Sequence, residues 1–143
     1  MKMILVIHGP NLDLLGKREP AIYGKVTLTE INRALRKAAK KHKVTLKIVQ
    51  SNHEGEIVDL IGKSRNKFCG LLINPAAYTH TSVAIRDAIS GSGILAVEVH
   101  LSNIHRREEF RRQSLISAVV SGTVMGFGAK SYTLGLSALL DLL

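Results

Sequence analysis

The amino-acid sequence predicts an α/β fold: a doubly wound, five-stranded parallel sheet with helices on both faces, in three layers. Two observations predict it. Short runs of β-branched and aliphatic residues alternate along the chain with segments whose apolar residues repeat at helical spacing. Most of the short runs are apolar at consecutive positions, which is typical of parallel strands that are covered on both faces.

The expected strands occupy residues 3–8, 44–50, 69–74, 94–100 and 117–124. Pro75 forces Asn74 into an extended conformation, so the third strand should end there. Because crossovers between parallel strands are right-handed, few strand orders remain for a sheet of this size. We expect the flavodoxin-like order.

Helices are expected between these strands. Thr27 and Glu30 form a capping-box signature at the start of the first one. The apolar residues that mark the helices are, in chain order, Leu28, Ile31, Leu35, Ala38 and Ala39; Ile57, Leu60 and Ile61; Val83, Ala84 and Ala88; and Leu136, Leu139, Leu140 and Leu143. The short, highly charged segment 103–114 is expected to be the remaining crossover. No linker or repeat divides the chain, so residues 1–143 are expected to form a single domain.

The composition limits the classes of function. A formal net charge of +9 raises the hypothesis of a nucleic-acid or anionic-ligand partner, and cationic but merely solvated helix faces are the alternative. Cys69, the single cysteine, is expected to be a buried small side chain. The N-terminal apolar run is too short for a signal-peptide core and no apolar run approaches the length of a membrane span, so we expect a cytoplasmic protein.

Several familiar chemistries lack their motifs. The sequence has no P-loop and no GxGxxG after a strand, which argues against nucleotide binding. Its Cys and His residues do not show zinc-site spacing, so no metal site is expected. In doubly wound sheets the ligand lies outside the carboxyl ends of the strands, so the functional residues are expected there.

The fourth strand ends in "VEVHLSN". Glu98 and His100 lie two residues apart, so their side chains should project from the same face. A carboxylate beside an imidazole fixes its tautomer and supports the protonated form, as a proton-donating histidine requires. A structural Glu–His pair is the alternative, but a charged side chain on a buried strand is costly unless something needs it.

The segment "NPAAYTHTS", residues 74–82, follows the third strand. Its hydroxyl residues at positions 79, 81 and 82 can cap the next helix, and His80 should lie at the mouth of the sheet. The segment could hold a small polyhydroxylated or anionic ligand. An ordinary strand-to-helix turn explains the pattern equally well.

Residues 9–24, "GPNLDLLGKREPAIYG", are long for a connection after the first strand and are expected to form an active-site lid loop. Arg18 and Tyr23 both lie in it. A guanidinium near a phenol favours the phenolate, so the pair could act as a general base on a closing loop. A surface loop with a solvated arginine and a packed tyrosine is the alternative.

Three segments carry a resemblance to a known family: "GPNLDLLGKREPAIYG", "NPAAYTHTSVAIRDA" and "EVHLSNIHRREEFR", in this order and spacing. Together they resemble type II 3-dehydroquinate dehydratase, and the similarity covers essentially the whole chain. The functional positions match the family, and Ala76, where many members carry glycine, is a common alternative. The resemblance implies a flavodoxin-like lyase of the shikimate pathway that forms 3-dehydroshikimate from 3-dehydroquinate by anti elimination of water through an enolate, without metal or organic cofactor.

The resemblance also assigns catalytic roles. Tyr23 would take the proton from the carbon beside the ketone, and Arg18 would hold Tyr23 as phenolate. Asn11 would help to orient the water that hydrogen-bonds the enolate oxygen. His100 would protonate the departing hydroxyl group, with Glu98 orienting its ring.

Other positions would bind the substrate. Asn74 and the turn of Leu101 and Ser102 would receive the substrate carboxylate, and His80 and Arg111 would contact the ring hydroxyl groups. The family assembles as a dodecamer of trimers, in which the residue that matches Asp87 reaches a neighbouring subunit's active site. Without the resemblance, Asp87 beside Arg86 reads as a surface ion pair.

Two alternatives of other classes remain open. The basic residues Arg33, Arg36, Lys37, Lys40, Lys41 and Lys43, with Arg111 and Arg112, could form a nucleic-acid-binding surface. Aromatic residues for base stacking make up only 4% of the chain, which weakens this hypothesis. A flavodoxin-like carrier is the other alternative, although "HGPNLDLL" does not offer a hydroxyl-rich turn for a flavin phosphate.

Overall fold

The computed structural model describes residues 2–17 and 19–143, with Pro20 and Tyr23 described by their backbone alone. In this part of the chain, five parallel strands form one sheet in the order β2-β1-β3-β4-β5. The strands are β1 (Met3–His8), β2 (Thr45–Gln50), β3 (Gly70–Asn74), β4 (Ala96–His100) and β5 (Gly122–Met125). This strand order is the flavodoxin-like order, so the predicted fold class is confirmed.

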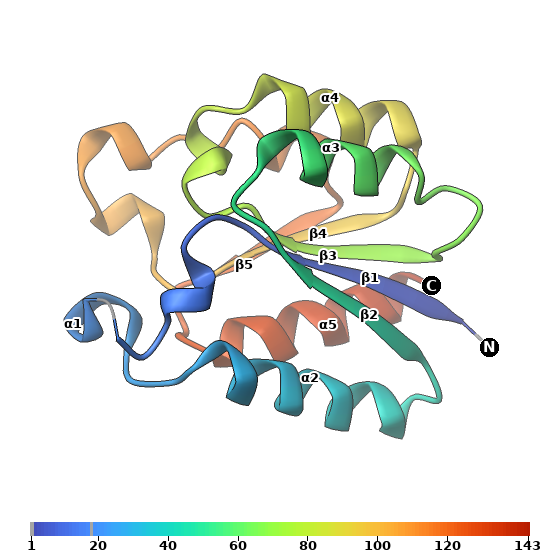
Figure 1. Cartoon of the computed structure of the whole chain (residues 1–143), viewed down its shortest axis with the longest axis horizontal. Coiled ribbons are helices and arrows are strands. Elements are labelled where there is room, and N and C mark those ends of the chain that lie inside the picture. Colours follow the sequence, from blue (N-terminus) through green and yellow to red (C-terminus); the bar gives the residue numbers. More distant parts are fainter. Residues whose placement is uncertain (1, 18) are drawn as a thin grey trace.

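Helices cover both faces of the sheet (Figure 1). The helices are α1 (Pro20–Tyr23), α2 (Leu28–Lys41), α3 (Glu54–Gly62), α4 (Val83–Ser92) and α5 (Lys130–Leu142). Figure 1 shows α3 and α4 above the sheet and α2 and α5 below it, with the carboxyl ends of the strands pointing to the left. Alternate residues of the buried strands pack on each side: Leu5 and Ile7 against α3 and α4, Ile4 and Val6 against α2 and α5.

The helix starts follow from local sequence. The Thr27 side chain accepts a hydrogen bond from the Glu30 backbone N–H at 3.2 Å, which caps α2. The side chain of Ser82 accepts one from the backbone N–H of Ile85 at 2.9 Å and caps α4. The helix expected to reach Leu143 ends one residue earlier.

The segment 117–124 differs most from the sequence-based expectation. Its first part, Ser117–Val119, forms a 3₁₀ turn, and β5 begins only at Gly122. The Ser117 backbone N–H and side chain are both engaged, by Ser114 at 3.0 Å and by Glu98 at 2.7 Å, and these contacts turn the chain out of the sheet. The preceding segment 103–114 contains the 3₁₀ turns Ile104–Arg106 and Glu109–Arg111.

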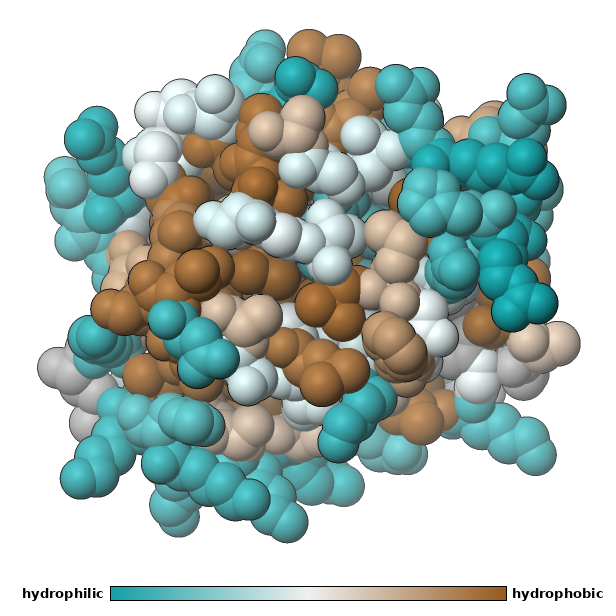
Figure 2. Space-filling model, turned by 180° about the vertical axis from the view of Figure 1, so that it is seen from behind, coloured by the Kyte–Doolittle hydropathy of each residue, from teal (hydrophilic) through white to brown (hydrophobic). Residues whose placement is uncertain are grey.

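The surface separates charge from apolar side chains. The basic residues of α2 named above are exposed, while Ile31, Leu35 and Ala39 on the other side of the helix are buried. Figure 2 shows hydrophilic side chains along the lower edge of the molecule, where α2 runs, and many apolar side chains on the face above it. This arrangement favours a solvated basic face on α2 over a nucleic-acid-binding surface.

Cys69 is half-buried, with its thiol 3.2 Å from the Met3 carbonyl oxygen.

Among the described residues, none of the helices combines the length and the apolar content needed to cross a membrane. The cytoplasmic location and the single domain over residues 1–143 stay predictions from the sequence.

Candidate active site

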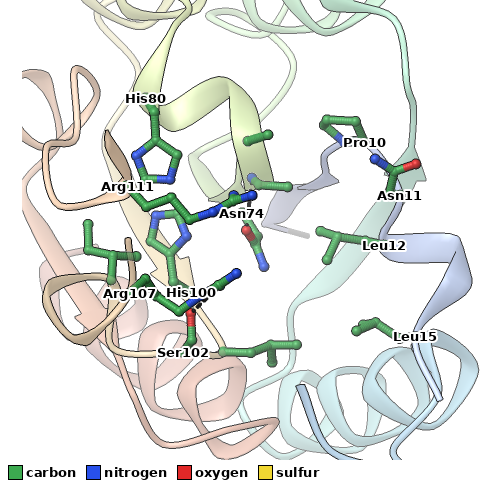
Figure 3. Close-up of a pocket in the computed structure, with 14 residues that line it drawn as sticks. Pro10, Asn11, Leu12, Leu15, Asn74, His80, His100, Ser102, Arg107 and Arg111 are labelled. Carbon is green, nitrogen blue, oxygen red and sulfur yellow. Dashed lines mark hydrogen bonds between the residues drawn. The ribbon is translucent and has the colours of Figure 1, made fainter. Parts of the chain in front are cut away.

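A cavity opens at the carboxyl edge of the sheet, where the segments after β1, β3 and β4 meet. Figure 3 shows two sides to it. His80, His100, Arg107 and Arg111 lie on one side, and the segment 10–15 lies on the other. Asn74 lies between them. The cavity therefore offers cationic and imidazole groups facing a mostly apolar wall.

Glu98 and His100 point to the same side of β4, as the two-residue period of a strand predicts. The His100 Nε2 atom lies 2.6 Å from the Glu98 Oε2 atom. His100 is 6% exposed and lines the cavity, whereas Glu98 is fully buried behind it. Because Nε2 is bound to the carboxylate, Nδ1 is the ring nitrogen left to exchange a proton with a ligand.

Hydroxyl groups surround the Glu98 carboxylate. Thr79 donates to Oε2, Ser117 donates to Oε1 at 2.7 Å, and Ser114 lies 3.0 Å from Oε2 and 3.1 Å from Oε1. Burial alone would raise the pKa of Glu98, but hydrogen bonds from His100, Thr79 and Ser117 and the charge of His100 together hold it below its ordinary value. Glu98 is therefore ionised and can stabilise a protonated His100. Thr79 was expected to be a helix cap, but its hydroxyl serves this carboxylate.

His80 follows the turn after β3 and lines the cavity. Its Nδ1 atom lies 2.8 Å from the carbonyl oxygen of Gln113, which can only accept, so Nδ1 carries the proton and Nε2 is the acceptor. Burial is the main cause that lowers the pKa of His80, and the nearby His100 and Arg111 lower it further. His80 is thus suited to accept a hydrogen bond from a ligand hydroxyl group.

The arginines come from the crossover between β4 and β5. Arg111 is half-buried, donates from Nε to Glu108, and lies 5.0 Å from the centre of the Phe110 ring. Arg107, which sequence reasoning missed, also lines the cavity and donates to the Ser102 hydroxyl at 3.2 Å. Ser102 and the buried Leu101 lie beside them in the cavity wall.

The segment after β1 passes very close to the turn after β3. The Gly9 N–H donates to the Asn74 carbonyl oxygen at 2.8 Å, and a Cβ atom at Gly9 would lie 2.4 Å from the Pro75 oxygen. Only glycine allows this approach. The next residues enter the cavity wall, where Asn11 adopts a left-handed conformation with φ of 66°. Its backbone N–H donates to the Asn52 side chain at 2.9 Å.

Ala76, where the resemblance leads to glycine in many members, has φ of 53°. An alanine in this left-handed region is strained by about 1 kcal/mol or more, which gives a physical reason for glycine at this position. The Ala76 N–H donates to the Asn74 side-chain oxygen at 3.0 Å, and this contact holds the turn in place.

Asp87 is the one remaining predicted site residue whose side chain the structure describes. Asp87 is exposed on α4, outside the described lining of the cavity, and Arg86 beside it donates to the Leu115 carbonyl oxygen at 3.0 Å. Arg18 and the side chain of Tyr23 lie outside the described residues. The rest of the expected lid segment contains a 3₁₀ turn at Leu12–Leu14 and the short helix α1.

Sequence reasoning missed a buried polar network behind Asn74. The Asn74 Nδ2 atom donates to the Tyr132 hydroxyl at 3.1 Å, and that hydroxyl lies 2.8 Å from Nδ1 of His8. On the other side of the ring, His8 Nε2 lies 2.7 Å from the Asn32 side-chain oxygen. His8 and Tyr132 are both fully buried. A histidine at the end of an otherwise apolar strand was the signal that could have found this network.

The network predicts a pH dependence of stability. Burial, only partly offset by the hydrogen bond with Asn32, lowers the pKa of His8 from 6.5 to about 4. The unfolded chain therefore binds a proton at this residue first as the pH falls, so unfolding becomes easier between pH 7 and pH 4. We expect His8 to account for on the order of 3 kcal/mol of lost unfolding free energy across this window.

Denaturant unfolding at several pH values, at one fixed protein concentration, measures this effect. His8→Asn removes the titrating group, so its unfolding free energy should fall less steeply over the same pH window. Equal slopes for the two proteins would contradict a neutral, buried His8. His80, whose pKa is also lowered, contributes in the same direction to both proteins and cancels in the comparison.

Within the described residues, no group of three or more His, Cys, Asp or Glu side chains is arranged to hold a metal ion.

Comparison with known proteins identifies the family. Residues 2–140 match the family described as dehydroquinase class II. The chain is 61% identical over 140 residues to a 3-dehydroquinate dehydratase of Trichodesmium erythraeum, covering 98% of this chain and 93% of that protein. It is 59% identical over 137 residues to the Acaryochloris marina protein of the same name, covering 96% and 92% of the two chains.

A solved structure agrees with the sequence comparisons. The type II dehydroquinase from Butyrivibrio crossotus superposes with a TM-score of 0.95 at 41% identity, covering 97% of each chain. The match in sequence and fold extends over nearly the whole length of these relatives, including the segments that build the cavity. The chain therefore belongs to the class II dehydroquinase family.

Proposed function

We propose that this chain is a 3-dehydroquinate dehydratase, which removes water from 3-dehydroquinate to give 3-dehydroshikimate. The observation that carries the proposal is the Glu98–His100 pair, whose imidazole faces a cavity with a cationic side and an apolar side. The full-length family match and the names of the relatives support the same reaction.

In the proposed mechanism, a base first removes a proton from the carbon beside the ketone. The electron pair of that C–H bond moves to the carbonyl oxygen and forms an enolate. We assign this step to Tyr23, with Arg18 favouring its phenolate form, because the family motif supplies them on the segment after β1. Figure 3 shows that part of this segment, residues 10–15, lies across the cavity from His100, which supports a base and an acid on opposite sides of the substrate.

The enolate then collapses, and the C–O bond of the leaving hydroxyl group breaks. His100 donates its Nδ1 proton to that oxygen, so the group leaves as water. The ionised Glu98 stabilises positive charge on the imidazole that must carry this proton. Its carboxylate accepts hydrogen bonds from the hydroxyl groups of Thr79, Ser114, Ser117 and Thr123. His100 is only 6% exposed, which limits loss of its proton to bulk water.

The other cavity residues bind and orient the substrate in this proposal. Asn74 and the backbone of Leu101 and Ser102 would receive its carboxylate. His80 and Arg111 would contact the ring hydroxyl groups. Asn11, from the facing wall, would orient the water that hydrogen-bonds the enolate oxygen.

The reaction is tested by adding 3-dehydroquinate to the purified protein and following the ultraviolet absorbance of the conjugated enone product. We expect enone formation without added metal or cofactor. A folded protein that forms no enone between pH 6 and pH 9 would overturn the proposal. In that case salt-sensitive oligonucleotide binding would favour the nucleic-acid-binding alternative, and a yellow, flavin-containing protein would favour the carrier.

We further propose that the active protein is a homo-oligomer, with the dodecamer of trimers as the expected form, and that Asp87 completes the site of a neighbouring subunit. Asp87 is exposed on α4, and Val83, one turn before it, is 56% exposed. Phe110 and Phe127 are 68% and 64% exposed, and Figure 2 shows a largely apolar face. Exposed apolar surface of this kind is typical of contacts between subunits.

Subunit complementation tests this sharing. Asp87→Ala and His100→Ala should each have little activity alone. When the two variants are dissociated, mixed and reassembled, activity should partly recover, because some sites then combine an intact His100 with a neighbour's intact Asp87. Each variant reassembled with itself is the control. No recovery from the mixture, or sedimentation of the active wild type as a monomer, would contradict the proposal.

A further inference from the structure

The amide of Asn74 is fixed from both ends. Its oxygen accepts from the Ala76 backbone N–H at 3.0 Å, and a backbone N–H can only donate. Its nitrogen must therefore be the atom that faces the Tyr132 hydroxyl, 3.1 Å away. The nitrogen carries a second hydrogen, and Asn74 lies in the cavity lining (Figure 3). In this orientation the amide can offer an N–H donor to a ligand.

The fixed Asn74 amide in turn fixes the direction in which the Tyr132 hydroxyl donates its proton. Because its oxygen accepts from Asn74, its own proton must go to another acceptor. The Nδ1 atom of His8, at 2.8 Å, is that acceptor. Tyr132 is fully buried, and its burial raises the pKa of its hydroxyl above the ordinary value, so the proton stays on the phenol at neutral pH.

His8 ends the chain of constraints. It can accept at Nδ1 only when it is neutral and carries its proton on Nε2, and that N–H then donates to the Asn32 oxygen at 2.7 Å. With a proton on Nδ1, His8 would instead donate to the Tyr132 oxygen. The Tyr132 proton would then have to point toward the Asn74 N–H, which is a donor and cannot accept it. Rotating the Asn74 amide by half a turn would give the Tyr132 proton an acceptor. It would also place the Asn74 nitrogen, a donor, against the Ala76 N–H, which is a donor too. The network thus has one consistent direction.

We propose that His8, acting through Tyr132, is a positioning residue that holds Asn74 as a hydrogen-bond donor toward the cavity. It thereby makes this position selective for an acceptor such as the substrate carboxylate. The inference rests on the proposed role of Asn74 in the dehydratase reaction. It assigns a function to a buried histidine and a buried tyrosine that the reaction steps themselves do not use.

Two amide replacements of His8 separate this role from simple packing. The amide of asparagine reaches about as far as the Nδ1 atom of histidine, so His8→Asn can still accept from Tyr132. The amide of glutamine reaches about as far as Nε2, so His8→Gln can still bind Asn32 but leaves Tyr132 without its acceptor. Tyr132→Phe removes the hydroxyl while keeping the ring.

Steady-state kinetics with 3-dehydroquinate should then show a split between KM and kcat. A contact made equally in the ground and transition states changes KM and leaves kcat. We expect His8→Gln and Tyr132→Phe to raise KM by about 10-fold or more, with kcat changed by less than about three-fold, and His8→Asn to keep both near the wild-type values. Equal KM increases for His8→Asn and His8→Gln, or no increase for His8→Gln and Tyr132→Phe, would overturn the proposal.

The tautomer of His8 gives a readout that does not need substrate. Solid-state NMR of the ligand-free wild-type protein labelled with ¹⁵N-histidine, with the His8 signals assigned by their loss in His8→Asn, should show a protonated Nε2 and an unprotonated Nδ1 from pH 7 to pH 5. A protonated Nδ1 would overturn the proposal. Asn74→Ala with an unchanged KM would instead show that the carboxylate role of Asn74 is wrong, and absence of turnover in the wild type would show that the dehydratase reaction is wrong.

Discussion

Replacement of His100 by alanine is expected to lower kcat by about 10²- to 10⁴-fold, the range that a positioned general acid contributes. His100 is the cavity histidine whose Nε2 atom contacts a buried carboxylate, which leaves Nδ1 for the leaving hydroxyl group. Alanine removes the proton donor, so the substrate hydroxyl group must leave as hydroxide or take its proton from solvent. Initial rates of enone formation at saturating 3-dehydroquinate measure the effect.

Two further variants show whether the loss is chemical. His42→Ala alters an exposed histidine at the end of α2 and should keep the wild-type rate. Glu98→Gln keeps the shape of the side chain but removes the charge that favours protonated His100. Its kcat should therefore fall as well, because the carboxylate charge beside the proton donor is lost. A His100→Ala enzyme with a rate near that of the wild type would exclude His100 as the acid.

Tyr23→Phe should retain substrate binding while losing most turnover, again by about 10²-fold or more. Phenylalanine keeps the aromatic ring but lacks the oxygen that would take the proton from carbon. Because this oxygen acts mainly in the transition state, kcat should fall while the dissociation constant of 3-dehydroquinate stays within a few-fold. Stopped-flow rates give the turnover, and calorimetry on the slow variant gives the dissociation constant.

Arg18→Ala is the companion to this variant. Without the guanidinium, the phenolate is less favoured, so activity should appear only at higher pH than in the wild type. The protein should still bind the substrate. A Tyr23→Phe enzyme that turns over at nearly the wild-type rate would mean that another group removes the proton, whatever the result for Arg18→Ala.

Much of the fold followed from local sequence patterns. The strand order was predicted because consecutive apolar positions mark buried parallel strands and the crossover rule then leaves few arrangements. The start of α2 at Thr27 and the end of β3 at Pro75 are set by neighbours in the chain. The failure was the segment 117–124, where Ser117 turns out of the sheet to reach Glu98. A contact across 19 residues outweighed a local preference for strand.

The candidate site also has features that the sequence predicts and features that it does not. The meeting of Glu98 and His100 was predictable, since residues two apart on a strand share a face. The hydroxyl groups of Thr79, Ser114 and Ser117 that hydrogen-bond the Glu98 carboxylate were not, because they come from two other segments of the chain. Each of these residues alone reads as a cap or a polar loop residue.

The sequence by itself determined the order of the strands, the edge of the sheet where the cavity lies and the pairing of Glu98 with His100 on β4, because each depends on the spacing of neighbouring residues. Only the tertiary structure decided how those groups are held. His8 and Tyr132 are 124 residues apart, yet their side chains meet and set the orientation of Asn74. Such pairs depend on which elements pack face to face, and a buried polar group must find its partner there because leaving it without one costs about 1–3 kcal/mol.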